Sequence, residues 1–181
     1  MLAGDRDRYA ELVRKYEVRV RAHCFLMLSN AAEAEDAAQE VFIKAYQSLT
    51  SFHAKAAFST WVYRITANHC LDVLRKRQRR KTESWDALRE KDGEKAEALL
   101  ASDPDPEFPN ETAEILARLL SGLPEKSREI LVLRELQSLT YEEIAKVLNC
   151  TLDAVKSRLK RARQELELKF RHFSNPQASK R

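Results

Sequence analysis

Between residues 156 and 163 the chain carries five cations and no acidic side chain, directly after a short helical pattern ends. Lysine and arginine neutralise phosphate and hydrogen-bond guanine edges, and serine can donate or accept. The pattern therefore predicts a nucleic-acid-binding face. Its members are the polar residues of this run: Lys156, Ser157, Arg158, Lys160, Arg161 and Arg163.

A second group of polar and aromatic residues falls on one helical line at steps of three, four, seven and four: Trp61, Arg64, Asn68, Arg75 and Arg79. An indole ring can stack on an unpaired base, an amide can hydrogen-bond a base edge, and guanidinium groups neutralise phosphate. From the pattern alone, a core tryptophan beside a solvated basic helix end is an equal alternative.

A third group lies in the helical segment over residues 31–49, on the face opposite the apolar side chains of that segment. Asp36, Gln39, Glu40, Ile43 and Gln47 form an acidic and amide patch that includes one isoleucine. On spacing alone, a solvated helix face is favoured over a binding surface.

Two histidine–cysteine pairs, His23-Cys24 and His69-Cys70, could be drawn together as a zinc site. Adjacent helical residues point about 100° apart, however, and metal-binding pairs on helices sit three or four residues apart. Three cysteines without a CxxC pair also do not suggest a disulfide framework. We therefore predict buried small hydrophobes here, and neither a metal site nor a cofactor.

These groups need helices to position them. One long helix is expected from Asp5 to about Leu28, and a second over residues 31–49, begun by Asn30 with Glu33 at the capping-box spacing. A third is expected over residues 58–80. The inward stripe of the second helix should be Ala38, Val41, Phe42, Ala45 and Leu49.

The C-terminal segment reads as a helix-turn-helix. Thr140 and Glu143 form a capping box for a short helix over residues 141–148, and Thr151 caps a second helix after a short turn. In such a motif the second helix enters the major groove. An ordinary helical hairpin with a basic outer face is the structural alternative. The buried stripe of the second helix is expected to be Val155, Leu159, Ala162 and Leu166.

Composition and charge divide the chain. Only three of 181 residues are glycine, and 33% are charged. No apolar run approaches the roughly 20 residues that span a bilayer, and the N-terminus lacks a signal-peptide core, so we predict a cytoplasmic protein without membrane insertion. Net charge is +5 over residues 1–80, −6 over 81–112 and +5 over 113–181. Basic blocks of this kind suggest a polyanionic partner.

The acidic stretch contains Pro104, Pro106 and Pro109, which interrupt helix and central strand alike. The predicted fold class is therefore all-α: two small helical domains joined by a flexible acidic linker, the C-terminal one a helix-turn-helix. The expected boundaries are 1–80, linker 81–112, 113–173, and a disordered tail over 174–181.

The order of these segments resembles a bacterial RNA polymerase sigma factor of the extracytoplasmic-function group (ECF, group IV). The stretches that carry the resemblance are DAAQEVFIKAYQSL, FSTWVYRITANHCLDVLRKRQRR, LPEKSREILVLRELQSLTYEEIAKVL and TLDAVKSRLKRARQEL. Each alone is moderately specific, whereas all four in this order and at this length are highly specific. Together they cover nearly the whole chain outside the linker.

The resemblance implies a dissociable subunit, not an enzyme, that directs core RNA polymerase to promoter DNA. It implies a polymerase-binding surface (Asp36, Gln39, Glu40 and Ile43). It implies that the loop over residues 51–57 and the helix after it read and help to melt the proximal promoter element (Trp61, Arg64, Asn68, Arg75, Arg77, Arg79 and Arg80). The distal element would meet the six residues of the 156–163 run, although Lys160 stands where apolar or aromatic residues are also familiar. An anti-sigma factor is a further implied partner.

Two other classes of protein fit part of the sequence. A stand-alone helix-turn-helix regulator would account for residues 123–170 but leave DAAQEVF and the FSTW helix without a role. A DNA-processing enzyme needs a nucleophile or converging carboxylates for a metal, and Asp36 and Glu40 have no third acid plausibly beside them.

Overall fold

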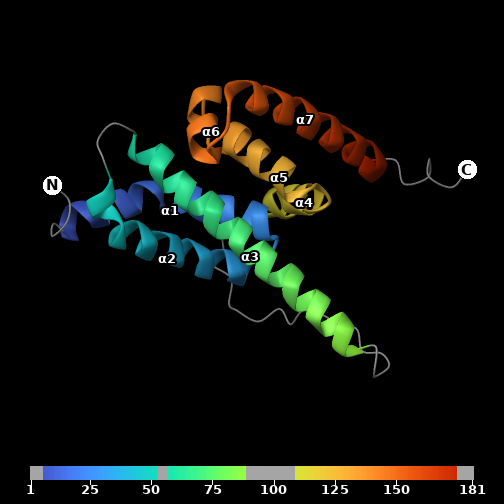
Figure 1. Ribbon diagram of the computed structural model, residues 1–181, viewed down its shortest axis with the longest axis horizontal. Coiled ribbons are helices and arrows are strands. Elements are labelled where there is room, and N and C mark those ends of the chain that lie inside the picture. The colour runs from blue at the N-terminus through green and yellow to red at the C-terminus, as the bar shows by residue number, and fades with distance from the viewer. Residues whose placement is uncertain (1–5, 53–56, 89–108, 175–181) are drawn as a thin grey trace, which may run out of the picture.

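The computed structural model describes residues 6–52, 57–88 and 109–174, and over these ranges the chain is helical without a strand (Figure 1). This agrees with the all-α prediction. The elements are α1 (Arg6–Leu28), α2 (Ala31–Gln47), the short 3-10 turn η1 (Leu49–Ser51), α3 (Phe58–Leu88), α4 (Glu111–Ser121), α5 (Glu125–Leu131), the π-helical turn η2 (Val132–Leu136), α6 (Tyr141–Leu148) and α7 (Leu152–Ser174).

The first helical unit is made of α1, α2 and α3, which pack on one another. Ser29, with φ 55°, ends α1, and the Asn30 side chain accepts a hydrogen bond from the Glu33 N–H at 3.0 Å to begin α2. In a complete capping box the Glu33 carboxylate would accept the Asn30 N–H. Here it contacts Arg77 on α3 and so joins two helices. All five residues of the stripe predicted for the second helix are buried, although α2 ends at Gln47 and Leu49 lies in η1.

The second helical unit contains α4 to α7, and it positions the helix-turn-helix. The capping box at the start of α6 is complete: the Glu143 N–H donates to Thr140 Oγ1 at 3.2 Å, and the Thr140 N–H donates to Glu143 Oε2 at 2.8 Å. Asn149 ends α6 in the left-handed region, and Thr151 Oγ1 accepts from the Ala154 N–H to begin α7. The helix-turn-helix prediction is therefore confirmed in its local structure.

The last turns of α1 form the common core of both units. The unbroken run His23–Leu28 is buried, which an amphipathic surface helix does not allow. The burial arises because α1 packs on α2 and α3 on one side and on α4, α5 and η2 on the other. The apolar residues here are Cys24, Phe25, Leu26, Met27 and Leu28.

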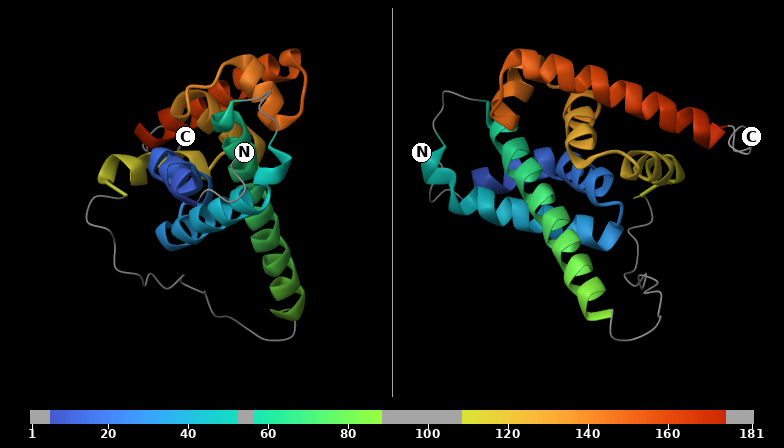
Figure 2. Two further views of the ribbon diagram at one scale, coloured as in Figure 1. Left: turned by 90° about the vertical axis from the view of Figure 1, so that its left-hand side faces the viewer. Right: turned by 45° about the vertical axis from the view of Figure 1, so that its right-hand side comes forward.

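The two units are docked on each other. Besides the contacts of α1, the short α6 packs against α3, and the three views show α6 beside the first turns of α3 (Figures 1 and 2). The C-terminal half of α3 extends away from the other helices (Figure 2). The start of α3, which was expected to read the proximal promoter element, thus lies beside α6, the first helix of the helix-turn-helix.

Several element ends differ from expectation. Helix α3 continues to Leu88, past the expected boundary at residue 80, because no proline or glycine interrupts it there. Helix α4 begins at Glu111, where Asn110 caps it. Helix α7 runs to Ser174. Most of the predicted linker, part of the predicted reading loop and all but the first residue of the predicted tail lie outside the described residues.

Candidate nucleic-acid and partner interfaces

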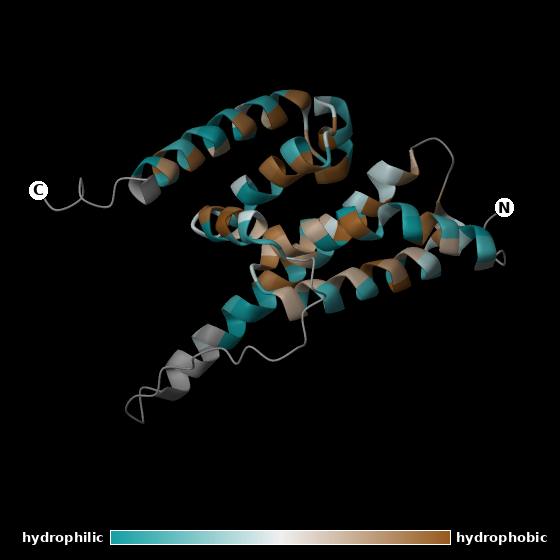
Figure 3. Ribbon diagram, turned by 180° about the vertical axis from the view of Figure 1, so that it is seen from behind, coloured by the Kyte–Doolittle hydropathy of each residue, from teal (hydrophilic) through white to brown (hydrophobic). Residues whose placement is uncertain are grey.

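Helix α7 presents a cationic face. The six polar residues predicted for the distal element are all exposed, whereas Val155, Leu159 and Ala162 are buried behind them. In Figure 3 hydrophilic and hydrophobic residues alternate along α7, as expected for a helix with one buried side. Leu166, the last residue of the predicted stripe, is half-buried.

Two of these cations have acidic neighbours. Lys156 Nζ lies 3.4 Å from Asp153 Oδ1 in the first turn of α7, and Arg163 Nη2 donates to Glu135 Oε1 of η2 at 2.9 Å. Both pairs are exposed, so each is a weak interaction that a DNA phosphate can replace. Arg163 and Lys160 also border a groove of about 370 Å³ beside Tyr141.

The start of α3 carries an aromatic cluster. The Trp61 ring lies 5.1 Å from that of Phe52 and 5.4 Å from that of Phe58, between ring centroids, and Phe52 and Phe58 lie 5.7 Å apart. Such distances are typical of stabilising aromatic pairs. Phe52 and Phe58 stand on either side of residues 53–57, so the cluster fixes both ends of the predicted reading loop. Trp61 itself is half-buried.

The arginines along α3 have different surroundings. Arg79 and Arg80 are exposed, and Arg75 Nη1 lies 3.0 Å from Asp72 Oδ1 on the same helix. Arg77 instead donates to the Leu28 carbonyl at the C-terminus of α1 and to the Glu33 carboxylate. Arg77 therefore joins α1, α2 and α3, a structural role that the sequence did not indicate.

Arg64 connects the two units. Its Nη2 donates to the carbonyl of Lys146 in the last turn of α6, a position where a cation also interacts favourably with the helix dipole. Asn68, one turn further along α3, is exposed. Arg64, one of the residues predicted to meet the proximal element, is thus engaged by the helix-turn-helix.

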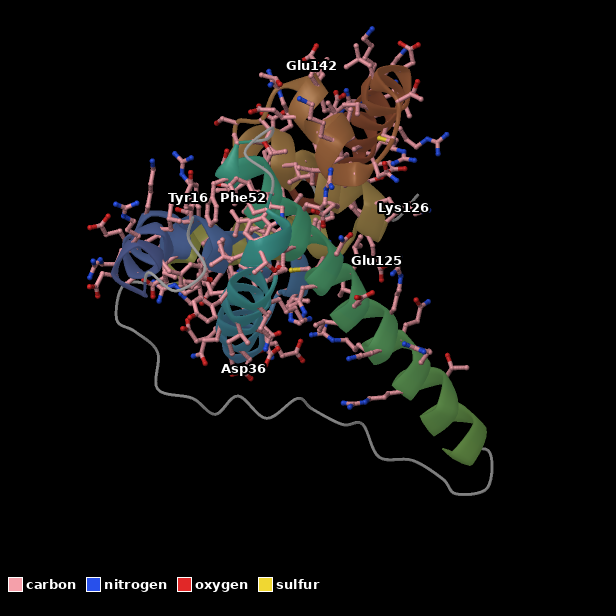
Figure 4. The ribbon with its side chains drawn as sticks, turned by 60° about the vertical axis from the view of Figure 1, so that its left-hand side comes forward. Tyr16, Asp36, Phe52, Glu125, Lys126 and Glu142 are labelled. Atoms are coloured by element: carbon pink, nitrogen blue, oxygen red, sulfur yellow. The ribbon has the colours of Figure 1, made fainter. Side chains whose placement is uncertain are left out.

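Helix α2 exposes the predicted acidic patch. Asp36, Gln39, Glu40 and Ile43 are all exposed, Ile43 by 50%. Figure 4 labels Asp36 on α2, on the opposite side of the molecule from Glu142 on α6. Tyr46, 40% exposed, extends the patch by one helical turn. The sequence contained this signal, because Tyr46 lies three residues after Ile43.

A contact between α2 and α3 borders this patch. Lys44 Nζ lies 2.6 Å from His69 Nδ1. Burial lowers the pKa of His69, and the Lys44 charge lowers it further. The imidazole is therefore neutral near pH 7, and its Nδ1 accepts a hydrogen bond from the Lys44 ammonium.

Buried polar residues at the contact between the units were not predicted. Arg128 is 6% exposed, and its guanidinium donates to the carbonyls of Leu120 (3.0 Å), Ser121 (2.9 Å) and Leu123 (3.4 Å). It also donates across the contact to the Met27 carbonyl of α1. One guanidinium thus satisfies carbonyls at the ends of two helices.

Two further polar contacts cross between the units. His23 Nε2 lies 3.2 Å from Glu129 Oε1, and both side chains are buried. The angles are poor for a hydrogen bond, so this is a close polar contact only. Gln137 Nε2 donates to the Arg19 carbonyl at 3.1 Å.

The cysteines of the hypothetical zinc site meet, but the histidines do not join them. Cys24 Sγ and Cys70 Sγ lie 3.7 Å apart and both are buried, whereas His23 and His69 have the partners described above. The contact with Cys24 and burial hold the pKa of Cys70 well above its ordinary value, so this thiol stays protonated. The described ranges contain no cluster of three potential metal ligands. No helix within them is long and apolar enough to cross a bilayer.

Comparison with known proteins identifies both units. Residues 12–80 match Sigma-70 region 2, and residues 113–166 match Sigma-70 region 4. The chain is 33% identical over 173 residues to the ECF RNA polymerase sigma factor SigW of Bacillus subtilis, covering 93% of this chain and 91% of that one. It is 36% identical over 169 residues to the ECF RNA polymerase sigma-E factor of Escherichia coli K12, covering 92% and 88%.

Two solved structures share the fold. CnrH in complex with the cytosolic domain of CnrY superposes with a TM-score of 0.67 at 23% identity, covering 91% of this chain and 88% of that one. The sigma factor RpoE in complex with the anti-sigma factor NepR from Bartonella quintana gives 0.66 at 22% identity, covering 89% and 97%. The arrangement of helices described above is therefore one that solved proteins adopt.

Proposed function

Because this chain belongs to the extracytoplasmic-function RNA polymerase sigma factors, which direct transcription initiation, we propose that its three exposed faces divide the work of initiation. Helix α7 reads the distal promoter element, the start of α3 reads and helps to melt the proximal element, and α2 binds core polymerase. The observation that carries this proposal is the cationic face of α7, exposed along a capped helix-turn-helix in a chain that also contains region 2.

The acidic patch of α2 suits a polymerase surface. Its acidic and amide residues adjoin the exposed Ile43 and Tyr46, and a combination of apolar and polar side chains is typical of protein interfaces. The patch lies on the opposite side of the molecule from the helix-turn-helix (Figure 4), so polymerase can hold α2 while α7 reaches DNA.

Promoter melting is assigned to the aromatic end of α3. Unstacking a base costs a few kcal/mol, which stacking on an aromatic ring can offset. Trp61 is held by Phe52 and Phe58, and the exposed Asn68 lies two turns further along the helix with a side-chain amide for base edges. Arg75 and Arg79 continue this line as phosphate contacts, and the exposed Arg80 lies beside it.

Promoter binding requires the two units to separate. Helix α6 packs on α3, and Arg64 is engaged by the Lys146 carbonyl, so the helix-turn-helix covers part of the proximal-element reader. Two spaced promoter elements cannot both be read from this arrangement. Core polymerase therefore holds the units apart, and tethering then multiplies two modest DNA affinities.

Three further assignments complete the proposal. The protein is a non-enzymatic subunit, it works in the cytoplasm, and an anti-sigma factor holds it inactive. The last assignment is supported by one structural neighbour, the sigma factor RpoE of Bartonella quintana, which was solved in complex with the anti-sigma factor NepR. The expected units, 1–80 and 113–173, enclose the two matched regions, and residues 81–112 link them.

The experiment that tests the function is in vitro transcription from a randomised promoter library, using purified bacterial core polymerase with and without this protein. We expect transcripts only in its presence, with two spaced elements shared upstream of their start sites. Duplex binding by the protein alone, without any initiation by polymerase, would instead favour the stand-alone regulator.

A further inference from the structure

A polar cavity of about 510 Å³ lies between the two helical units. Helix α1 contributes Tyr16, labelled in Figure 4, to its wall. The remaining lining residues come from α1 and α3 (Lys15, Arg19, Ser59, Tyr63), from the segment that leads into α6 (Gln137, Ser138, Leu139) and from the first turn of α6 (Glu143). Its size falls within the roughly 300–1,000 Å³ of small-molecule sites.

One buried polar atom at this cavity lacks a partner among the described residues. The Gln137 Oε1 atom accepts no hydrogen bond, although the side chain is only 3% exposed. The hydroxyl of Tyr63, a side chain 1% exposed, makes no hydrogen bond of good geometry, but the Arg19 side chain lies within reach of it: burial raises the pKa of Tyr63, and Arg19 lowers it again in part. Because buried polar groups in folded proteins are nearly always paired, Gln137 Oε1 indicates an occupant of the cavity.

The charges of the lining favour an anion. Lys15 and Arg19 supply two cations, and the hydroxyls of Ser59 and Ser138 supply donors. The one acidic residue, Glu143, already accepts the Thr140 N–H through Oε2. Gln137 Oε1, by contrast, needs a donor. An occupant that meets all of these groups carries an anionic group and also a hydroxyl or amine.

We propose that this cavity binds a small phosphorylated compound with a hydroxyl or amino group, and that binding keeps the two units docked. The phosphate is held by Lys15 and Arg19, with Tyr63 donating, and the hydroxyl or amine donates to Gln137. Ordered water is the competing occupant, because polar cavities commonly hold it.

Binding and docking are coupled because the site exists only when the units are together. Lys15, Arg19 and Tyr63 belong to the first unit, whereas Gln137 and Ser138 belong to the second. A ligand present at 100 times its Kd would therefore raise the ratio of docked to separated protein about 100-fold. The effect on transcription rests on the proposed function, whereas binding itself does not.

The test uses the full chain with four probes: inorganic phosphate, pyrophosphate, ribose 5-phosphate and ADP. Affinity is measured by isothermal titration calorimetry for the wild type, Arg19→Gln and Tyr63→Phe. Tyr63→Phe removes only the hydroxyl and keeps the ring. Arg14→Gln is the matched control, because Arg14 is an exposed cation on the same helix outside the cavity.

Docking is followed in parallel by energy transfer between dyes on α2 and α7, attached through Gln47→Cys and Gln164→Cys in a Cys150→Ser background. We expect at least one probe to bind with a Kd of about 1 mM or tighter, roughly tenfold more weakly in both cavity variants but equally well in Arg14→Gln. The same probe should increase energy transfer. The identity of the tighter probes distinguishes free phosphate from a sugar phosphate or nucleotide.

Three results would overturn the proposal. If no probe binds, the cavity holds water only. If Arg14→Gln weakens binding as much as the cavity variants do, the attraction is a general property of the basic surface. If binding leaves energy transfer unchanged, the site does not control docking. Transcription with core polymerase in the absence of any probe tests the proposed function independently of all three.

Discussion

Replacing Arg128 by alanine should destabilise the whole protein. The guanidinium is buried, and three of its nitrogens donate to four carbonyls, three in the second unit and one, of Met27, in the first. A hydrogen bond from a charged donor contributes about 1.5–3 kcal/mol. The bond to Leu123 is long, at 3.4 Å, and water can reach the carbonyl of the exposed Ser121, so about two of the four bonds are lost at full cost. We expect a loss of about 3–5 kcal/mol in the free energy of unfolding.

Urea denaturation followed by circular dichroism measures this loss, with Arg118→Ala as the control. Arg118 is an exposed cation on α4, and its replacement should change stability by less than about 0.5 kcal/mol. Arg128→Lys keeps the charge but loses the planar set of donors, so it should recover only part of the stability. A loss below about 1 kcal/mol for Arg128→Ala would show that the four carbonyls do not depend on this side chain, and would refute the reasoning.

Three further predictions concern the exposed faces. Asn68→Ala should impair open-complex formation, measured by permanganate reactivity of the promoter, more than polymerase binding; equal losses would remove its assigned role. Lys156→Ala should weaken binding of the distal element by polymerase holoenzyme and reduce the slope of log affinity against log salt by about 1, whereas Lys126→Ala should not. The pKa of His69, measured by NMR, should lie below 6.5 and rise in Lys44→Met, because burial and then the Lys44 charge disfavour the imidazolium. The neutral ring thus stabilises the fold above pH 6.5, and this contribution is lost as the pH falls through the lowered pKa; an unchanged pKa in Lys44→Met would contradict the role of Lys44.

Local signals predicted the elements that position the site. The capping box of Thr140 and Glu143 involves residues three apart, so its geometry follows from the sequence alone. The α2 stripe likewise follows from helical periodicity, and all of it is buried. Such features need no knowledge of distant partners, which explains why the helix-turn-helix and the exposed faces of α2 and α7 could be anticipated.

Features that depend on distant partners were missed. Arg128, Glu129 and Gln137 are polar residues in a chain in which a third of all residues are charged, so their types suggested exposure. Arg77 was assigned to DNA because it stands in a run of cations, yet its neighbours in space are Leu28 and Glu33. Only the docking of α3 on α1 reveals that difference. The sequence did contain one signal of this docking. The run His23–Leu28 has no polar face that could meet solvent, which indicates burial from all sides.

The contact between the units combines an apolar core with buried polar side chains. Its polar members include Arg128, Glu129, His23 and Gln137, and each can be hydrated when the units separate. Exchanging their protein hydrogen bonds for water hydrogen bonds costs on the order of 1 kcal/mol each. The apolar part is the end of α1, where Phe25, Leu26 and Met27 belong to the same buried cluster as residues of the second unit. Because exposed apolar area costs about 25 cal/mol per Å², this core sets most of the free energy that polymerase and promoter contacts together must supply to separate the units.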